Sequence, residues 1–419
     1  MTYDNKNQDE MLAEKGDPQA QLRVGVSYLE NSENLQDLRK ALSYLRKSAI
    51  QSNSLAQYTL GVVHERGKGV DQDVVTSLKW FFIAAEAGHQ QAQLFTKELR
   101  PNITTKQVQA AQNLATYFND AVMLYKASIV KKNPEWQYKL GYLFEEGLGV
   151  DKDHAEAAHW YKLAHEQKHI PAHVALGKLY FAGLGVERDA MRAVELFNMS
   201  SENGNPDGHY YLGYAYETAS GVTQNLEEAY ELYLLAAEQD HELALLRLGL
   251  MFRTGINVKS KMTEVAQESQ KKYGMTSKYD EVIEKKKEWY SQDYEKALGY
   301  FKRSVDKGNP EAQCNLGLFY AQALGVTQDF ELAIKYFRQA ASQGHAESMS
   351  NLAFMYAHGQ SVKADYHKAA MWYEVSRRLG FNTIQKNMEF VFSKLTTEQA
   401  QAAQTLASNC MQVDYKGYN

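Results

Sequence analysis

The sequence has 419 residues, a formal net charge of −5 at pH 7 and 44% hydrophobic residues, so it can bury a continuous core but shows no electrostatic footprint for a polyanion. Its two cysteines, Cys314 and Cys410, exclude a disulfide framework, and no apolar run reaches the length of about 18 residues that a membrane span needs. The first residues, MTYDNKNQDE, lack the apolar segment of a signal peptide. We therefore expect a cytoplasmic protein, or else one that is exported or translocated into a host cell by a route that the sequence does not show.

A residue pair, usually Leu-Gly, recurs at a constant interval along the chain. From Gly25 to Gly61 is 36 residues, and most later steps have the same length. A constant period of this size is the signature of a solenoid. The recurring positions are Gly25, Gly61, Gly141, Gly177, Gly213, Gly249 and Gly317, with Ala353 in the last copy. Because glycine has no side chain, we expect a second helix to pack closely at each of these points.

Each repeat is predicted to contain two helices. The first helix carries the Gly and ends at a loop, G-x-G-V in its clearest copies, because glycine suits the left-handed conformation that ends helices. The second helix is expected to begin twelve residues after the Gly, at an Asp or Asn, the residue types that cap helix N-termini best. These expected caps are Asp37, Asp73, Asp153, Asp189, Asn225, Asp329 and Asp365, together with Asp293, which an insertion of 32 residues places 44 residues after Gly249. Asn-Pro pairs such as Asn133-Pro134 predict the N-cap and first helical residue of the next repeat.

Taken in order, the chain begins with a polar segment in which a short helix is expected around Asp9–Lys15, and a degenerate first repeat follows from Pro18. The second repeat is followed by a half-repeat and by TTKQVQAAQNLA, Thr104–Ala115. Nearly the same segment, TTEQAQAAQTLA, stands at Thr396–Ala407. Thr followed three residues later by Gln predicts a capping box. We interpret both segments as terminator helices, and we expect a separate helix over Asp120–Lys132.

This order predicts two domains. Residues 1–118 would form a short repeat array with a capping helix, and residues 119–419 a longer array with six full repeats and a C-terminal capping helix. One loop of the longer array carries an insertion at about 259–290 that is rich in lysine and acidic residues. Insertions in repeats project from one face of a solenoid, often the binding face. A solvated helical hairpin without a partner is the alternative for this segment.

The repeated pattern A-x-x-x-L-G-x-x-Y, G-x-G-V-x-x-D and A-x-x-W-Y-x-x-A-A-x-x-G resembles the Sel1-like repeat, a relative of the tetratricopeptide repeat. The resemblance covers roughly residues 17–416. It implies an all-α fold, a right-handed superhelical solenoid of antiparallel helix pairs. It also implies a non-enzymatic scaffold or adaptor, with roles of the kind known for bacterial Sel1-like proteins in signalling, envelope and host-interaction complexes.

In the tetratricopeptide family the first helices line the concave side. If the resemblance holds, residues three before and one, four and five after each Gly face a groove that binds protein or peptide segments. These residues include Tyr58, Tyr138, Tyr142, Phe181, Tyr210, Tyr214, Arg253, Phe354 and His358. Aromatic and Arg side chains are the types that a peptide-binding hot spot uses. Glu145, Glu146 and Glu217 would form an acidic rim that favours basic segments, whereas partial burial in the core is the alternative for tyrosines such as Tyr138 and Tyr210.

Other patterns that could suggest chemistry are largely explained by the repeat. His165, His169 and His173 have the spacing of metal ligands, but His169 occupies a position where other repeats also carry His, and Pro171 breaks any helix that would carry all three. The G-x-G loops follow no predicted strand, so they do not indicate phosphate binding. We therefore assign no catalytic, cofactor-binding or metal-binding residue, and expect no nucleic-acid partner. Two alternatives stay open: a regulator that clasps an enzyme such as a cell-wall hydrolase, and a metal-dependent enzyme using the region His154–His173.

Overall fold

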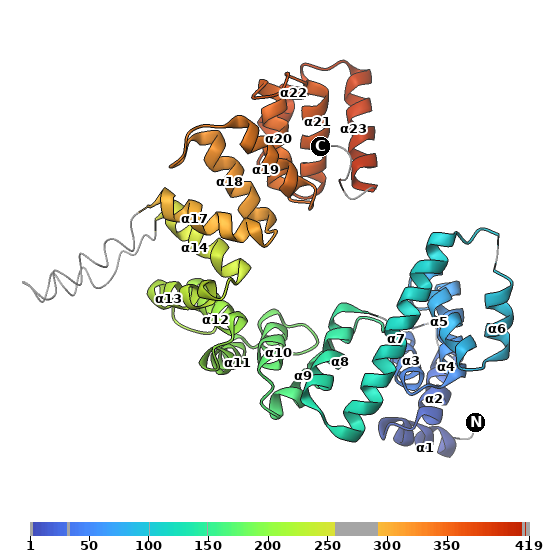
Figure 1. Ribbon diagram of the computed structural model, residues 1–419. Coiled ribbons are helices and arrows are strands. Elements are labelled where there is room, and N and C mark those ends of the chain that lie inside the picture. Colours follow the sequence, from blue (N-terminus) through green and yellow to red (C-terminus); the bar gives the residue numbers. More distant parts are fainter. Residues whose placement is uncertain are drawn as a thin grey trace, which may run out of the picture. The chain divides into compact units, whose positions relative to one another are not determined.

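The computed structural model describes residues 3–31, 34–99, 101–148, 150–255, 292–412 and 415. Across these residues the chain forms 21 α-helices and no strand (Figure 1), so the predicted all-α fold of repeated helix pairs is confirmed. None of the helices among these residues is both long and apolar enough to cross a membrane. Contacts between residues group the chain into two units, Met1–Ser200 and Ser201–Asn419.

The first unit is built from pairs of helices that share one hydrophobic core. Its helices are α1 (Tyr3–Glu14), α2 (Pro18–Asn31), α3 (Leu35–Ile50), α4 (Ser54–Arg66), α5 (Val74–Glu86), α6 (Gln90–Lys97), α7 (Thr105–Lys131), α8 (Pro134–Glu146), α9 (His154–Glu166), α10 (Ile170–Ala182) and most of α11 (Ala190–Glu202). The repeats pair α2 with α3, α4 with α5 and α8 with α9, and each pair contacts the helix that follows it. The core runs from Leu22 in α2 to Leu196 in α11, so neighbouring repeats bury one continuous apolar layer.

The second unit repeats the same arrangement. Its helices are α12 (Pro206–Thr218), α13 (Leu226–Glu238), α14 (Glu242–Thr254), α17 (Tyr294–Asp306), α18 (Pro310–Gln322), α19 (Phe330–Ala341), α20 (Ala346–His358), α21 (Tyr366–Arg378), α22 (Gln385–Phe392) and α23 (Thr397–Gln412). The pairs are α12 with α13, α14 with α17, α18 with α19 and α20 with α21, and α23 packs against α21. The predicted insertion at 259–290 lies outside the described residues.

The recurring glycines bring the two helices of each repeat into close contact, as predicted. A Cβ atom at Gly177 would lie 2.5 Å from Cε1 of Phe197, and one at Gly317 would lie 2.5 Å from Cε1 of Phe337. Both phenylalanines are almost completely buried. Because real Cβ contacts are longer than this, the aromatic ring of the second helix occupies the space that a side chain on the first helix would take.

Most of the predicted helix caps are confirmed. At Asp73, Asp153, Asn225, Asp293, Asp329 and Asp365 the side chain accepts a hydrogen bond from the backbone of the following helical turn. Asp189 accepts in the same way from the Arg192 amide, at 3.0 Å. The prediction for Asp37 is wrong, because α3 begins earlier and Asn34 caps it through a 2.7 Å hydrogen bond from the Gln36 amide. Asn34 is an equally good capping residue, and the loop before it lacks the usual G-x-G.

Helix α7 departs from the predicted helix pattern. The expected terminator helix at Thr104–Ala115 and the separate helix at Asp120–Lys132 are one helix of 27 residues. The capping box at Thr104 is present, and its partner Gln107 accepts from the Thr104 amide at 2.9 Å. The intervening residues contain no Gly or Pro, so nothing in the local sequence stops the helix.

The packing of α7 explains why it does not close an array. It contacts α5 on one side and α8 on the other, and it therefore connects the second repeat to the next full repeat (Figure 1). The matching segment near the C-terminus also has its capping box, in which the Gln399 side chain accepts from the Thr396 amide at 3.0 Å. The predicted boundary at residue 118 falls inside α7, and the division into domains 1–118 and 119–419 stays a prediction.

Candidate functional site

The tyrosines three residues before the Gly pack against the histidine that caps the first helix of the next repeat. The pairs are Tyr58–His89, Tyr138–His169 and Tyr210–His241, with ring centroids 4.3, 5.1 and 4.8 Å apart. Each histidine is the N-cap of its helix. Tyr210 is 7% exposed, whereas Tyr58 and Tyr138 are half-buried. These three rings therefore contribute to contacts between successive repeats, and Tyr210 offers little surface to a partner.

Residues just after the Gly include the most exposed aromatic side chains of the predicted groove. Tyr142 on α8 is 46% exposed and Phe354 on α20 is 39% exposed. The His358 ring stacks on Phe354 with centroids 4.1 Å apart, and it also lies 6.3 Å from the ring of Phe390 on α22. Phe354, His358 and Phe390 thus form a surface patch in the second unit, which we call the Phe354 patch.

The other predicted groove residues are engaged in contacts between helices. The guanidinium of Arg247 on α14 lies 5.1 Å from the ring centroid of Tyr214 on α12. Arg253 donates a hydrogen bond to the Asn315 side chain of α18. Phe181 lies with its ring centroid 6.3 Å from that of Phe197 in the same repeat. Their side chains remain partly exposed, so their role in a groove stays a prediction.

Two of the three residues of the predicted acidic rim belong to networks inside the solenoid. The Tyr161 hydroxyl donates to Glu145 at 2.5 Å, and two repeats later the Tyr233 hydroxyl donates to Glu217 at 2.5 Å. Burial and the adjacent carboxylate raise the pKa of both tyrosines well above its ordinary value. Basic residues of the following repeat lie nearby, with Lys178 Nζ 3.9 Å from Glu145 and Arg247 Nη1 3.8 Å from Glu217. Glu146 alone among the three is exposed.

The histidines with metal-ligand spacing do not converge on one point. His165 and His173 pack edge to face with ring centroids 4.8 Å apart, while Nε2 of His169 lies 3.0 Å from Oε2 of Glu135. No group of three or more His, Cys, Asp or Glu residues in the described part of the chain could hold a metal ion. Burial, then the neighbouring His173, lowers the pKa of His165. The geometry places His165 and His173 in the packing between α9 and α10, and His169 against α8.

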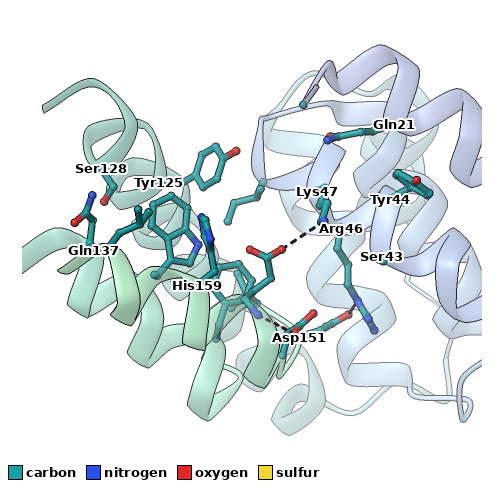
Figure 2. A pocket seen from close by; sticks show the side chains of 18 of the residues that line it. Gln21, Ser43, Tyr44, Arg46, Lys47, Tyr125, Ser128, Gln137, Asp151 and His159 are labelled. Carbon is teal, nitrogen blue, oxygen red and sulfur yellow. Dashed lines mark hydrogen bonds and ion pairs between the residues drawn. The ribbon is translucent and has the colours of Figure 1, made fainter. Parts of the chain in front are cut away.

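A pocket that the sequence analysis did not single out lies within the first unit (Figure 2). Its volume is about 650 Å³, and residues from α1, α2, α3, α5, α7, α8 and α9 line it. Trp80, Phe118 and Trp160 give it an apolar floor, and all three side chains are buried. Figure 2 shows Arg46 and Lys47 on one side of the pocket and Tyr125, Ser128 and Gln137 on the other.

A buried carboxylate joins distant parts of the chain at the edge of this pocket. Oδ2 of Asp151, in the loop before α9, lies 2.5 Å from Nε of Arg46, and Oδ1 lies 3.4 Å from Nζ of Lys79. Nε2 of His64 lies 3.8 Å from the same carboxylate. Burial alone would raise the pKa of Asp151, but Lys79, His64 and Arg46 outweigh it and hold the pKa far below its usual range. Asp151 therefore stays ionised and bridges α3 and α5 to the start of α9.

The sequence contains two signals for this region of the first unit. The pocket lies where the spacing between Gly61 and Gly141 exceeds the regular period, and α7 occupies the additional length. Lys79 is a second signal, because it interrupts the otherwise apolar end of VVTSLKWFFIAA in α5. Its partner Asp151 is 72 residues away, and no local pattern connects the two.

The family comparison agrees with this fold. The family model for the Sel1 repeat matches residues 18–53, 54–89, 134–169, 170–205, 206–241, 288–309, 310–345 and 346–381. Among solved structures, the chain is similar to a Sel1 repeat protein from Oxalobacter formigenes, with 23% identity and a TM-score of 0.47 over 92% of this chain and 89% of that one.

Two further solved structures are similar over much of the chain. One is c5321, a protective antigen present in uropathogenic Escherichia coli strains, with 25% identity and a TM-score of 0.31 over 98% of this chain and 96% of that one. The other is the immunity protein Pa5087 from Pseudomonas aeruginosa, with 19% identity and a TM-score of 0.35 over 68% of this chain and 83% of that one. Because the family model matches more than half of the residues, the chain belongs to the Sel1 repeat family.

Proposed function

We propose that this chain is a non-enzymatic scaffold or adaptor that binds segments of partner proteins on the face of its first helices. Sel1 repeats generally serve as non-catalytic scaffolds for interactions between proteins, which supports the proposal. The observation that carries it is the exposure of Tyr142 and Phe354, two large aromatic side chains that follow the recurring small residue on a first helix. Burying such rings against a partner contributes about 25 cal/mol of favourable free energy for each Å² of apolar surface removed from water.

Each unit offers its own contact surface in this proposal. In the first unit Tyr142 stands next to the exposed Glu146 on α8, and in the second unit the Phe354 patch combines two phenylalanines with the His358 ring. Aromatic side chains of this kind dominate the energetics of protein interfaces. A preference for basic segments, a bacterial signalling, envelope or host-interaction setting and a cytoplasmic location stay predictions.

A matched pair of double variants tests the proposal. Tyr142→Ala with Phe354→Ala removes one exposed ring from each unit, and Tyr117→Ala with Leu235→Ala removes side chains of similar exposure, 46% and 45%, outside this face. Substitution of exposed residues should change the free energy of unfolding by no more than about 0.5 kcal/mol. Circular dichroism and thermal melting would confirm that both variants fold.

The readout is quantitative co-purification of partners with the tagged full chain. We expect at least one partner to be lost from the Tyr142→Ala, Phe354→Ala variant and retained by the control variant. Equal recovery of every partner by the two variants would reject the face of the first helices as the binding surface.

A further inference from the structure

We propose that the pocket of the first unit binds a segment of a partner protein that carries a lysine or arginine next to an apolar side chain. The proposal rests on the proposed scaffold function and adds a second, separate site to it. The new site is lined largely by the second helices α3 and α9 and by α7, rather than by the face of the first helices.

The pocket exists because α7 replaces a regular helix pair. Along this one helix, Phe118 packs edge to face against Trp80 with ring centroids 5.0 Å apart. Two turns further on, Tyr125 packs edge to face against Trp160 with ring centroids 5.7 Å apart. Helix α7 therefore joins the second helix of one repeat to the second helix of another, and its own side chains form one wall of the pocket.

Contacts between α3 and the start of α9 hold the opposite wall in place. The Arg46–Asp151 ion pair described above is reinforced by a weaker one, in which Nζ of Lys47 lies 3.6 Å from Oε1 of Glu156. In Figure 2 Arg46 lies beside Asp151, and a dashed line joins Lys47 to the carboxylate with which it pairs. The pocket is thus formed within the folded chain and does not need a ligand to create it.

The floor of the pocket fits an apolar side chain. Leu163 and Ile50 extend the aromatic floor formed by Trp80, Phe118 and Trp160. The volume of about 650 Å³ lies within the range of pockets that enclose a ligand of several linked groups.

The charges at the pocket select a basic side chain. Asp151 and Glu156 are neutralised by cations within the unit, as described. Glu14 accepts a hydrogen bond from the neutral Tyr44 hydroxyl, at 2.6 Å. Neither Glu14 nor Glu166 has an ion pair among the described residues. Lys132 is the one lining cation without a carboxylate partner in that part of the chain. The charged lining residues comprise five acidic side chains (Glu14, Asp151, Asp153, Glu156 and Glu166) and three basic ones (Arg46, Lys47 and Lys132). The lining is therefore acidic, and a lysine or arginine of the bound segment would complement it.

An array of synthetic peptides is a direct probe of this site. The array consists of acetylated and amidated Gly/Ser hexapeptides in which two adjacent central positions vary over all residue types, and it is incubated with the labelled full chain. We expect binding to peptides that pair Lys or Arg with an aromatic or aliphatic residue, and weaker binding as salt is added. Absence of bound peptides, or enrichment of peptides without a basic residue, would overturn the proposal.

Variants then locate the bound peptide by fluorescence anisotropy. Glu14→Lys with Glu166→Lys reverses two of the acidic charges that have no ion pair, and Ser43→Trp fills the pocket from α3. Each should weaken the tightest array peptide by about tenfold or more, a change of about 1.4 kcal/mol. Glu195→Lys makes the same charge reversal on an exposed residue of α11 outside the pocket, and it should leave the affinity unchanged.

Peptide anisotropy and partner co-purification together separate this proposal from the proposed function. If Tyr142→Ala weakens the peptide and the pocket variants do not, the peptide binds the first helices, the pocket proposal fails and the scaffold function stands. If the pocket variants weaken the peptide while partner recovery is unaffected by Tyr142→Ala and Phe354→Ala, the pocket proposal stands and the face of the first helices is excluded. If Ser43→Trp does not fold, the test uses the variant Glu14→Lys with Glu166→Lys alone.

Discussion

Nε of Arg46 lies 2.5 Å from Oδ2 of Asp151, although 105 residues separate them in the chain. The same carboxylate is the nearest anion to Lys79, whose ammonium group is almost completely buried and whose pKa is lowered by that burial in spite of Asp151. A buried ion pair adds little when it is complete, but removal of one partner leaves an uncompensated charge in a poorly solvated site.

Substitution of Asp151 by Asn should therefore destabilise the protein by about 3–5 kcal/mol, because Lys79 and Arg46 lose their counter-ion. Asp71 holds the corresponding position in the second repeat but is exposed, so Asp71→Asn is a matched control with an expected change within about 0.5 kcal/mol. Urea unfolding followed by tryptophan fluorescence measures both. Equal effects of the two substitutions would show that the buried cluster is not electrostatically coupled.

Substitution of Gly177 by Ala should destabilise the protein by about 1–3 kcal/mol, because the new Cβ would lie 2.5 Å from the buried Phe197 ring. A methyl group added at Gly299 in α17 would instead enter open space, with nothing within 4 Å, and Gly299→Ala should stabilise by about 0.5–1 kcal/mol through helix propensity. Thermal and urea unfolding measure whether each substitution lowers or raises the free energy of unfolding. A stabilising effect at Gly177 would contradict the close approach of α10 and α11.

Substitution of Tyr233 by Phe should cost about 1.5–3 kcal/mol, because the hydroxyl donates a 2.5 Å hydrogen bond to the Glu217 carboxylate. A double-mutant cycle with Glu217→Gln isolates the interaction between the two side chains. Tyr117→Phe, on an exposed ring of α7, is the control for removal of a hydroxyl group. Additive effects of the Tyr233 and Glu217 substitutions would argue against a direct bond in solution.

The stability of the first unit should fall as the pH drops below about 6.5, the ordinary pKa of histidine. Burial, together with His173, Arg192 and Lys162, lowers the pKa of His165 and outweighs the opposing effect of Glu166. The unfolded chain therefore binds a proton more readily than the folded chain, and stability rises with pH between the folded and unfolded pKa values. His165→Asn should show a shallower loss of stability below that pH than the parent protein. Parallel pH profiles from urea unfolding would show that His165 does not contribute.

Local sequence determines most of the fold because the repeat unit contains its own signals. Capping side chains such as Asp73 and Asp153 and close contacts such as Gly177 with Phe197 depend on neighbours at constant separations, so they can be predicted from spacing. Helix α7 could not be predicted in the same way, since continuation between Ala115 and Asp120 depends on packing against two other helices.

The candidate sites were less predictable because exposure depends on the next repeat. Tyr210 and Phe354 were both placed in a groove from their positions relative to the recurring small residue, yet Tyr210 is covered by the ring of His241 and Phe354 is open to solvent. The pocket depends on residues from seven helices, and the long-range pairing of Asp151 leaves no periodic trace in the sequence.

In an ordinary solenoid each repeat contacts only its neighbours, so melting can begin at either end and spread repeat by repeat. The ionic bridge at Asp151 changes this for the first unit, because it attaches α3 to the loop before α9 across the intervening repeat. Helix α3 cannot fray without also breaking that bridge. The consequence is a block that resists end-fraying and unfolds cooperatively, and amide hydrogen exchange in α3 should be as slow as in α9.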